Sequence, residues 1–585
     1  MHISNRETMT RKKHSLQVFF KIFLIPSLLY VLAISINFIT ALFLTSYPIV
    51  SDEVIYLINA RHIAKLLDPS VQDIPLLGGF SNLIKEIPNP IYHILLAPTI
   101  LLGQWKLVFL LIKLINTFLI SLLAPLVFAI GRRLGYSSLH ASAFALVSIA
   151  LPYNNFAGIV MVESLYYPAF YALILMFLWV LSRANVPSIL FFALACALIC
   201  KIKIVFFMLP IFFAIAMVLS LRMVNKERCY FLPAIYLTAT AIILLLAQYF
   251  SASIGGYSSD ISSYINAFRH PIQIAISFVN TTTSFLGLTL ATPALCVLFL
   301  PQYLKSIDST ELRAKYLAVF VVVFLISLFS IGFLSIHVIS VNGWSPNAHD
   351  QLVHERLYGY LAPLWFMLAG KYFLDIKDKS RIADATYLIV ILIWVTCGAW
   401  YSHIPEGHDV IHSSTLSLHY ILGKYSVIAT LLLACMSMFI YFTRPRFIFV
   451  ASILVLVLVL VLERGFHFYR IAFYAPTLPT ELLYYPKTKL VDDRNVTKAL
   501  YISKNYPLTV TYRAIMIGAR IMHVSCGGNI DSKDCDFRKG RTLLIQNANE
   551  PEISLPLGVR LIEIESNDFY KVRVYIVEGK STSIQ

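Results

Sequence analysis

Apolar runs of about twenty residues recur along most of the chain and are separated by short polar stretches. A helix built from such a run is long enough to cross the hydrocarbon core of a bilayer. The first run is too long for a removed signal peptide and lacks a small-residue cleavage site, so we predict that it is the first span. Apolar length and flanking charge predict about thirteen spans, near residues 18–44, 106–130, 138–153, 163–182, 187–200, 204–221, 230–250, 272–300, 316–340, 357–374, 385–402, 424–442 and 447–463. The predicted fold class is therefore mainly α, a polytopic membrane helical bundle.

Two parts of the chain depart from this pattern. In the long polar loop 45–104, polar residues share the stretch 54–67 with apolar ones, which predicts an amphipathic helix lying in the membrane interface. Residues 464–585 include segments such as 508–512, 560–564 and 570–575, in which polar and apolar residues alternate as in strands. We therefore predict two domains: a transmembrane domain over 1–463 that contains the first loop 45–104, and a small extracytoplasmic soluble domain over 464–585, α/β or β-rich.

Composition and charge support a membrane protein. Hydrophobic residues make up 58% of the 585 residues and charged residues 13%, and the mean hydropathy is +0.74. The formal net charge of +16 would suggest a nucleic-acid partner in a soluble chain. Here the basic clusters fall between apolar segments, as the positive-inside rule expects, so no nucleic-acid partner is predicted.

The same charges orient the predicted helices. With the N-terminus inside, basic or mixed-basic residues lie in every predicted inner loop, namely Arg132-Arg133, Arg183, Arg222 to Arg228, Lys305 to Lys315, Lys371 to Arg381 and Arg444 to Arg446. The predicted orientation depends on the separation of the short spans 187–200 and 204–221, because a single fused span would reverse the direction in which every later span crosses the membrane. The loop 45–104, the turns near 154–162, 201–203, 251–271, 341–356 and 403–423, and the segment after 464 then face outward.

Ionisable residues gather in four of these outward segments. Carboxylates can take a proton from an acceptor hydroxyl, and lysine and arginine can hold a phosphate, so together they suit a lipid-phosphate-linked substrate. The residues are Asp52 and Glu53 in the first loop, Glu163 at the start of the fourth span, Lys201 and Lys203 after the fifth, and His354, Glu355 and Arg356 before the tenth.

Each group also has a purely structural interpretation. Ser51, Asp52 and Glu53 can cap the interfacial helix, and a carboxylate at position 163 can reach water from the end of a span. The two lysines can extend to the interface, and Glu355 with Arg356 can form a surface ion pair of small energetic value.

These motifs, taken in order, resemble the GT-C glycosyltransferases. The acidic pair Asp52-Glu53, the interfacial helix after it and the segment Pro88-Asn-Pro-Ile-Tyr-His93 with Ala97-Pro98 carry the first part of the resemblance. The turn Gly131-Arg-Arg133 and the segment Met161-Val-Glu163-Ser carry the second part. The resemblance covers about residues 17–220 and, more loosely, 355–363, and the branch is that of bacterial aminoarabinose transferases and protein O-mannosyltransferases.

The resemblance implies a multi-span enzyme that uses a polyprenyl-phosphate-linked sugar on the outer membrane face, usually with inversion at the anomeric carbon. It implies that Asp52 is the general base, that Glu53 supports it, and that Glu163 binds acceptor or sugar hydroxyls. It implies that Lys201, Lys203 and Arg356 bind the donor phosphate. The remaining substrate-binding candidates are Tyr56, Lys85, His93, His354, Glu355 and Tyr358.

The predicted partners are a polyprenyl-phosphate-linked sugar donor, a glycan or lipid-linked acceptor and membrane lipids. This chain lacks the longer first-loop signature of the aminoarabinose and mannosyl branches, so the resemblance assigns neither sugar nor acceptor. Enzymes of this class favour an envelope glycan such as O-antigen as the acceptor, and the expected location of the enzyme is the bacterial inner membrane. The chemistry requires no cofactor, although a divalent cation stays open, and we find no metal-ligand spacing.

Two other functions stay open at this point. A glycan ligase or polymerase would use outer-loop arginine and histidine, and one predicted outer loop contains His403, His408, His412 and His419. A lipid or solute transporter is also polytopic. Such proteins keep ionisable coupling sites at mid-span and often carry internal repeats, whereas this sequence has few ionisable residues at mid-span and no internal repeat that we can find.

Overall fold

The computed structural model describes most of the first two thirds of the chain and the strands near its end. The described residues are 23–44, 51–69, 90–102, 105–224, 226–250, 265–289, 292–342, 358–375, a few positions between 457 and 468, and 496–502, 522–525, 541–547, 559–567 and 572–579. The chain divides into two compact units. The first contains residues 1–41, 116–158 and 162–471, and the second contains 42–115, 159–161 and 472–585.

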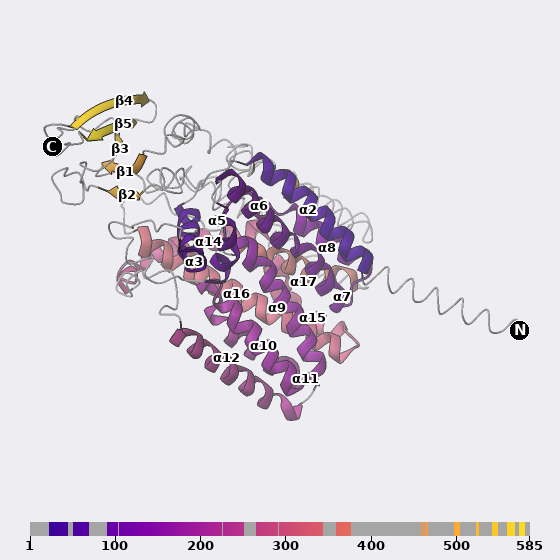
Figure 1. Cartoon of the computed structure of the whole chain (residues 1–585). Helices are drawn as coiled ribbons and strands as arrows, with labels where there is room; N and C mark the ends of the chain where they lie inside the picture. Colours follow the sequence, from indigo (N-terminus) through magenta and orange to yellow (C-terminus); the bar gives the residue numbers. More distant parts are fainter. Residues whose placement is uncertain are drawn as a thin grey trace, which may run out of the picture. The chain divides into compact units, whose positions relative to one another are not determined.

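The first unit is a bundle of helices (Figure 1). In chain order it contains α2 (Ile25–Phe43), the end of α6 (Trp105–Ser121), α7 (Leu123–Arg133), α8 (Ser138–Ala150), η2 (Pro152–Gly158), α9 (Glu163–Arg183), α10 (Val186–Cys200), η3 (Ile204–Met208), α11 (Leu209–Val224), η4 (Lys226–Arg228), α12 (Phe231–Phe250), α14 (Pro271–Leu288), α15 (Thr292–Ser306), α16 (Thr310–Asn342), η6 (Gly359–Leu361) and α17 (Ala362–Asp375). Packing joins α11 to α16, α7 to α8 and α9, and α10 to α9 and α12.

Among the described residues, five helical stretches are long and apolar enough to cross a membrane: Ile25–Phe43, Leu107–Arg133, Glu163–Arg183, Phe206–Val224 and Thr310–Ile336. Each of them overlaps one of the predicted spans. The predicted spans 385–402 and 424–442, and nearly all of 447–463, lie outside the described residues.

The structure keeps the two critical short spans apart. Helix α10 ends at Cys200, and α11 begins at Leu209 after a turn and η3. Asn185 starts α10 cleanly, because its side-chain oxygen accepts a hydrogen bond from the backbone N–H of Ser188 at 3.0 Å. The prediction that residues 187–200 and 204–221 form separate helices is therefore confirmed.

The predicted single span 272–300 is wrong, because the structure contains two helices there, α14 and α15. Pro293 lies in the first turn of α15, where its missing N–H costs nothing and its ring prevents the helix from continuing backwards. Pro125 likewise lies in the first turn of α7 and accounts for the break between α6 and α7 within the predicted span 106–130.

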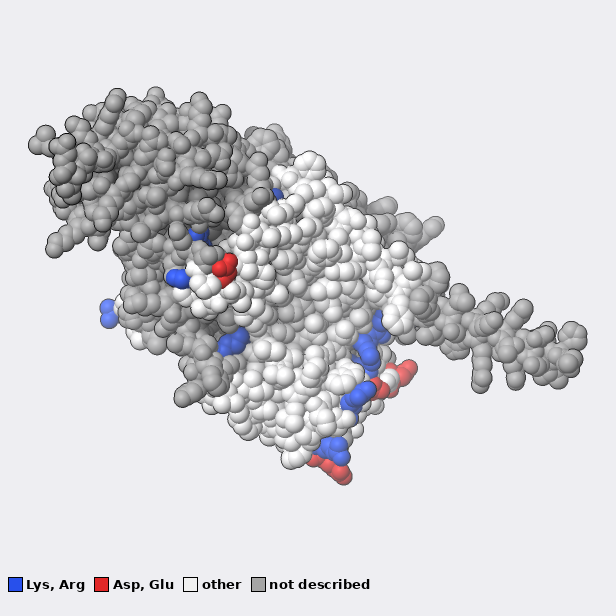
Figure 2. Space-filling view, in the orientation of Figure 1, with Lys and Arg blue, Asp and Glu red and all other residues white. Residues whose placement is uncertain are grey.

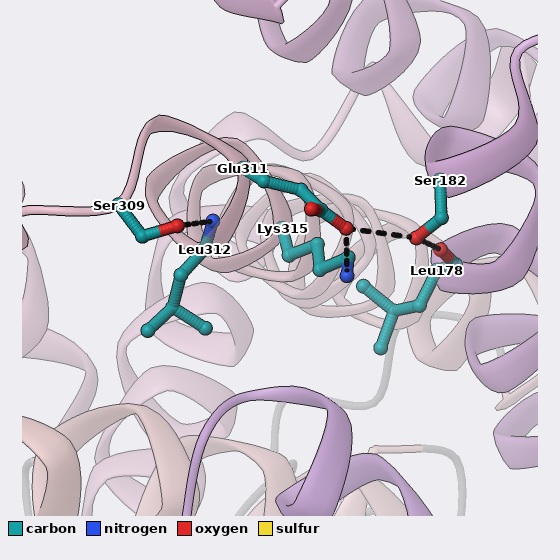
Figure 3. Close-up of polar contacts among 6 residues, drawn as sticks. All are labelled: Leu178, Ser182, Ser309, Glu311, Leu312 and Lys315. Atoms are coloured by element: carbon teal, nitrogen blue, oxygen red, sulfur yellow. Dashed lines mark hydrogen bonds and ion pairs between the residues drawn. The ribbon is translucent and has the colours of Figure 1, made fainter.

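The described parts of the predicted inner loops lie at one end of this unit, where Figure 2 shows basic and acidic side chains together at the lower right. Arg132 and Arg133 end α7, and Arg183 ends α9. The Ser182 hydroxyl donates a hydrogen bond to Glu311 at 3.2 Å, and Glu311 also pairs with Lys315 at 2.5 Å (Figure 3). This polar contact ties the end of α9 to the start of α16.

Two further contacts join the same end of the bundle. A guanidinium nitrogen of Arg228 donates to the backbone carbonyl of Ala184 at 3.2 Å. The Lys371 ammonium lies 5.4 Å from the ring centroid of Tyr136, just after the turn at Gly135, whose φ of +83° favours glycine. Basic segments that the sequence places on one membrane side are thus neighbours in the fold.

The second unit contains two helices of the first loop and a sheet. Helix α3 (Ser51–Leu67) covers the stretch predicted to be an interfacial helix, and it packs against α5 (Pro90–Ile100). The sheet is built from β1 (Val496–Ile502), β2 (Met522–Ser525), β3 (Arg541–Asn547), β4 (Val559–Asn567) and β5 (Val572–Gly579) (Figure 1).

The five strands lie in the order β2-β1-β3-β5-β4. Strand β1 is parallel to β2 and to β3, whereas β5 is antiparallel to β3 and to β4. The predicted strand 560–564 lies within β4, and β5 contains residues 572–575 of the predicted strand 570–575. The predicted strand 508–512 lies outside the described residues, and the domain boundary at 463/464 stays a prediction.

Candidate functional site

A buried ion pair joins two of the sequence-predicted site residues. Glu163 opens α9, and Lys203 precedes η3 in the turn that links α10 to α11. The Lys203 Nζ lies 2.5 Å from Glu163 Oε1, and the two side chains are 7% and 0% exposed. The interpretation of Glu163 as a carboxylate reaching water is therefore wrong, because the surrounding protein covers it completely.

Aromatic rings enclose the pair. The Lys203 ammonium lies 4.7 Å from the ring centroid of Tyr166, a distance at which a cation is attracted to the ring face. Tyr166 packs edge-on against Phe206 of η3 at 5.3 Å and against Tyr360 of η6 at 5.4 Å. Since such an environment has a low dielectric constant, the attraction between ammonium and carboxylate is stronger here than in water.

Three separate segments of the chain thus converge at the start of α9. The hydroxyl of Tyr171 in α9 donates to the backbone carbonyl of Tyr360 at 2.7 Å, and the rings of Tyr167 and Tyr360 stack at 5.2 Å. Tyr358, a predicted substrate-binding residue, is buried beside them and donates from its hydroxyl to Ser284 of α14 at 2.6 Å. The segment before α17 is therefore fixed next to α9.

The turn before α9 is held by asparagine side chains. Every residue of η2 is buried, so its backbone polar groups need partners within the protein. The amide of Asn154 donates to the carbonyls of Ser148 at 2.7 Å and Ile149 at 2.9 Å, which closes the C-terminal end of α8. The Ser164 hydroxyl donates to the carbonyl of Phe156 at 3.2 Å and joins η2 to α9.

Arg464 anchors the same turn from far along the sequence, and it is buried, with 7% of its surface exposed. Its Nε donates to Asn155 Oδ1 at 3.1 Å, and one Nη donates to the carbonyl of Ile149 at 2.5 Å. The other Nη donates to Asn37 Oδ1 at 2.8 Å and to the Thr40 hydroxyl at 3.3 Å in α2. One guanidinium therefore links α2, the end of α8 and η2.

The first-loop candidates lie in the second unit. Asp52 and Glu53 belong to the first turn of α3, which begins at Ser51, three residues before the predicted stretch 54–67, and their side chains are outside the described residues. The ring of Tyr56 lies 5.6 Å from those of Tyr92 and His93. Burial lowers the pKa of His93 to about 3, so this imidazole is neutral at physiological pH.

The remaining predicted residues have different outcomes. Lys201 is half-buried at the C-terminal end of α10, and burial lowers its pKa. The other predicted residues lie outside the described part of the chain, namely Lys85, His354, Glu355 and Arg356 and the four histidines His403, His408, His412 and His419. The roles predicted for them, and the ligase or polymerase alternative based on the histidines, stay predictions.

Sequence reasoning missed two residues of this region. Arg464 was placed at the start of the soluble domain, although an arginine directly after a long apolar run can also turn back into the bundle. Tyr360 was passed over in favour of Tyr358 and Arg356, and its buried hydroxyl has no hydrogen-bond partner in the part of the chain that the structure describes.

Comparison with known proteins identifies the class of fold. No protein-family model and no curated protein matches the chain. The fold nevertheless matches solved structures of ArnT over nearly the whole chain, in keeping with the resemblance seen in the sequence at the level of the fold.

The particular neighbours are structures of ArnT from Cupriavidus metallidurans. The chain matches the structure bound to undecaprenyl phosphate with a TM-score of 0.52 and 13% identity, over 93% of this chain and 97% of that chain. The structure in the apo state matches with the same values. The five described helical stretches that are long and apolar enough to cross a membrane indicate an integral membrane protein.

Proposed function

We propose that this protein transfers a sugar from a polyprenyl-phosphate donor to an envelope glycan acceptor, such as O-antigen or another cell-wall polysaccharide. The observation that supports this most is the fold, which matches ArnT, a protein whose solved structure contains undecaprenyl phosphate. The buried Glu163–Lys203 pair adds a lysine and a carboxylate at the end of a membrane-length helix.

The proposed chemistry is a displacement at the anomeric carbon. The acceptor hydroxyl attacks C1 of the sugar and gives its proton to Asp52, while the bond between C1 and the phosphate oxygen breaks with inversion. Glu53 supports the base. Polyprenyl phosphate leaves with the electron pair of that bond, so the step needs only a base at the acceptor and positive charge at the departing phosphate.

In this mechanism Lys201, Lys203 and Arg356 hold the donor phosphate. Lys203 already has an anionic partner, Glu163, which compensates its charge inside an aromatic enclosure. A phosphate that reaches Lys203 therefore competes with the Glu163 carboxylate for the ammonium. Glu163 released in this way can accept hydrogen bonds from sugar or acceptor hydroxyls, the role that the resemblance implies for it.

The proposed topology follows the positive-inside rule. About thirteen spans cross a bacterial inner membrane with the N-terminus in the cytoplasm. The end of the bundle that carries Arg132, Arg183 and Arg228 then faces the cytoplasm, and Glu163 and Lys203 face outward with the C-terminal domain. The contacts among the basic loops support their placement on one and the same side of the membrane.

The experiment is a transfer assay with purified protein in nanodiscs. Polyprenyl-phosphate-linked sugars are mixed with membrane glycan acceptors, and native protein is compared with Asp52→Asn and with Glu311→Gln, a control at the other end of the bundle. We expect transfer by the native protein and the control and a loss of at least about 100-fold with Asp52→Asn. Transfer by Asp52→Asn at the native rate would show that Asp52 is not the base.

We also propose that transfer requires no metal ion, because positioning and fixed cationic side chains suffice for an activated phosphate leaving group. In the same assay a chelator is added to the native protein, and the rate should stay unchanged. A rate that collapses with chelator and returns with a divalent cation would require a metal in the mechanism.

A further inference from the structure

Two buried polar side chains of the second unit form no hydrogen bond with any residue that the structure describes. Asn59 of α3 is 0% exposed and His93 of α5 is 1% exposed. Neither amide atom of Asn59 and neither ring nitrogen of His93 forms a hydrogen bond within the part of the chain that the structure describes. Buried side-chain polar atoms in native proteins are nearly always bonded, so two complete side chains without partners in one helix pair call for an explanation.

Both side chains belong to one helix–helix contact. Helices α3 and α5 pack together, and Tyr56 of α3 lies 5.6 Å from the rings of Tyr92 and His93 of α5. Asn59 lies three residues beyond Tyr56, which places it on the same face of α3, one turn along. Tyr56 therefore meets His93 across the two helices, and buried Asn59 follows Tyr56 along the same face of α3.

Their chemistry selects a neutral, hydroxyl-rich ligand. The asparagine amide offers two donors and an acceptor, and neutral imidazole offers one donor and one acceptor. Burial keeps His93 neutral, since its pKa is about 3. An anion would be held by cations, whereas paired donors and acceptors beside aromatic rings match hydroxyl groups carried on an apolar ring face.

We propose that Tyr56, Asn59 and His93 form a sugar-recognition site, in which the Asn59 amide and the His93 imidazole hydrogen-bond the hydroxyl groups of a neutral sugar. This proposal rests on the proposed glycosyl transfer, because it supplies the specificity for the sugar that the phosphate-binding residues cannot supply. Both side chains are buried, so α3 and α5 must move relative to each other to admit the sugar.

The proposal predicts that stability and binding change in opposite directions. Leucine in place of Asn59 and phenylalanine in place of His93 remove buried polar atoms that have no partner, so neither variant should melt at a lower temperature than native protein. Both should lose sugar recognition. A purely structural role for the two residues would instead lower the melting temperature.

The test uses the full chain in nanodiscs and three probes: undecaprenyl phosphate, an undecaprenyl-phosphate-linked hexose, and a soluble hexose oligosaccharide. If the sugar belongs to the donor, native protein should bind the linked hexose at least about tenfold more tightly than undecaprenyl phosphate alone, and Asn59→Leu and His93→Phe should abolish that ratio. If the sugar belongs to the acceptor, the oligosaccharide should bind native protein and lose at least about tenfold in affinity in both variants.

Ser330→Ala is the matched control, because the Ser330 hydroxyl is likewise buried without a partner among the described residues, but in α16 of the first unit. It should leave all three affinities unchanged. The proposal is overturned if both variants bind every probe as native protein does, or if both melt at lower temperature with native affinities, which would mean that the side chains hold buried water. The binding measurement needs no turnover, so its outcome is independent of the Asp52→Asn assay.

Discussion

Removing one member of the Glu163–Lys203 pair should destabilise the protein far more than removing both. In Lys203→Met the Glu163 carboxylate loses its cation in a site that is 0% exposed, and in Glu163→Gln the ammonium loses its anion. Breaking a buried pair in this way typically costs about 3–5 kcal/mol. Replacing both residues with apolar ones of similar volume is often neutral or stabilising, so Glu163→Leu/Lys203→Met should unfold within about 1 kcal/mol of native protein.

The chain contains its own control for this experiment. Glu311 and Lys315 also lie 2.5 Å apart, but the Glu311 side chain is 57% exposed (Figure 3). An exposed pair spaced by one helical turn contributes about 0.3–0.5 kcal/mol, so Glu311→Gln should change stability by no more than that. The two pairs share a distance and differ in burial, so any difference between them measures the effect of the surroundings.

Reversible unfolding in mixed detergent micelles, followed by tryptophan fluorescence, gives the free energy of unfolding for each variant. The two single substitutions and the double substitution form a double-mutant cycle. Each single substitution should lower the free energy of unfolding by several kcal/mol more than the double substitution does. Single substitutions that cost no more than Glu311→Gln, or a double substitution that costs the sum of the singles, would refute the reasoning.

Three further predictions concern single residues. Arg464→Met should lower the free energy of unfolding by about 3–5 kcal/mol, because it removes four side-chain hydrogen bonds from a buried region, and Arg464→Lys should recover little since an ammonium cannot replace the planar guanidinium. Gly359→Ala should cost about 1–3 kcal/mol or more, because the new Cβ would lie 2.1 Å from a ring carbon of Tyr153, and adding Tyr153→Ala should relieve that clash. The pKa of His93 is about 3 in the folded state and near 6.5 in the unfolded state. As the pH falls from 6.5 toward 3, protonation of the unfolded chain at this residue therefore lowers the free energy of unfolding by about 1.4 kcal/mol per pH unit, whereas above pH 6.5 it has no effect. His93→Phe should flatten that part of the stability–pH curve.

The parts of the fold that follow from local sequence were predictable. Basic residues after apolar runs mark helix ends, and the charge pattern of the later loops kept residues 187–200 and 204–221 as separate helices in the prediction. The stretch 54–67 carries its own amphipathic pattern, so α3 was predictable as well. The division of 272–300 was missed because apolar length outweighed Pro293, whose backbone effect ends one helix and starts the next.

The geometry of the site was less predictable, because it depends on contacts between distant segments. The sequence placed Glu163 and Lys203 at the same membrane side, but nothing in residue type shows that they pair with each other across 40 positions. Arg464 contacts residues more than 300 positions away, so its role depends on tertiary packing alone. The partnerless state of Asn59 and His93 likewise appears only when the neighbours of each atom are known.

The most direct measurement is the release of polyprenyl phosphate by the purified protein. An undecaprenyl-phosphate-linked sugar and an envelope glycan acceptor are incubated with native protein in nanodiscs, and the lipid product and the glycosylated acceptor are quantified over time. The account predicts that both appear at equal rates with native protein and that neither appears with Asp52→Asn. Native protein that neither binds undecaprenyl phosphate nor releases it from any linked sugar tested would contradict the account.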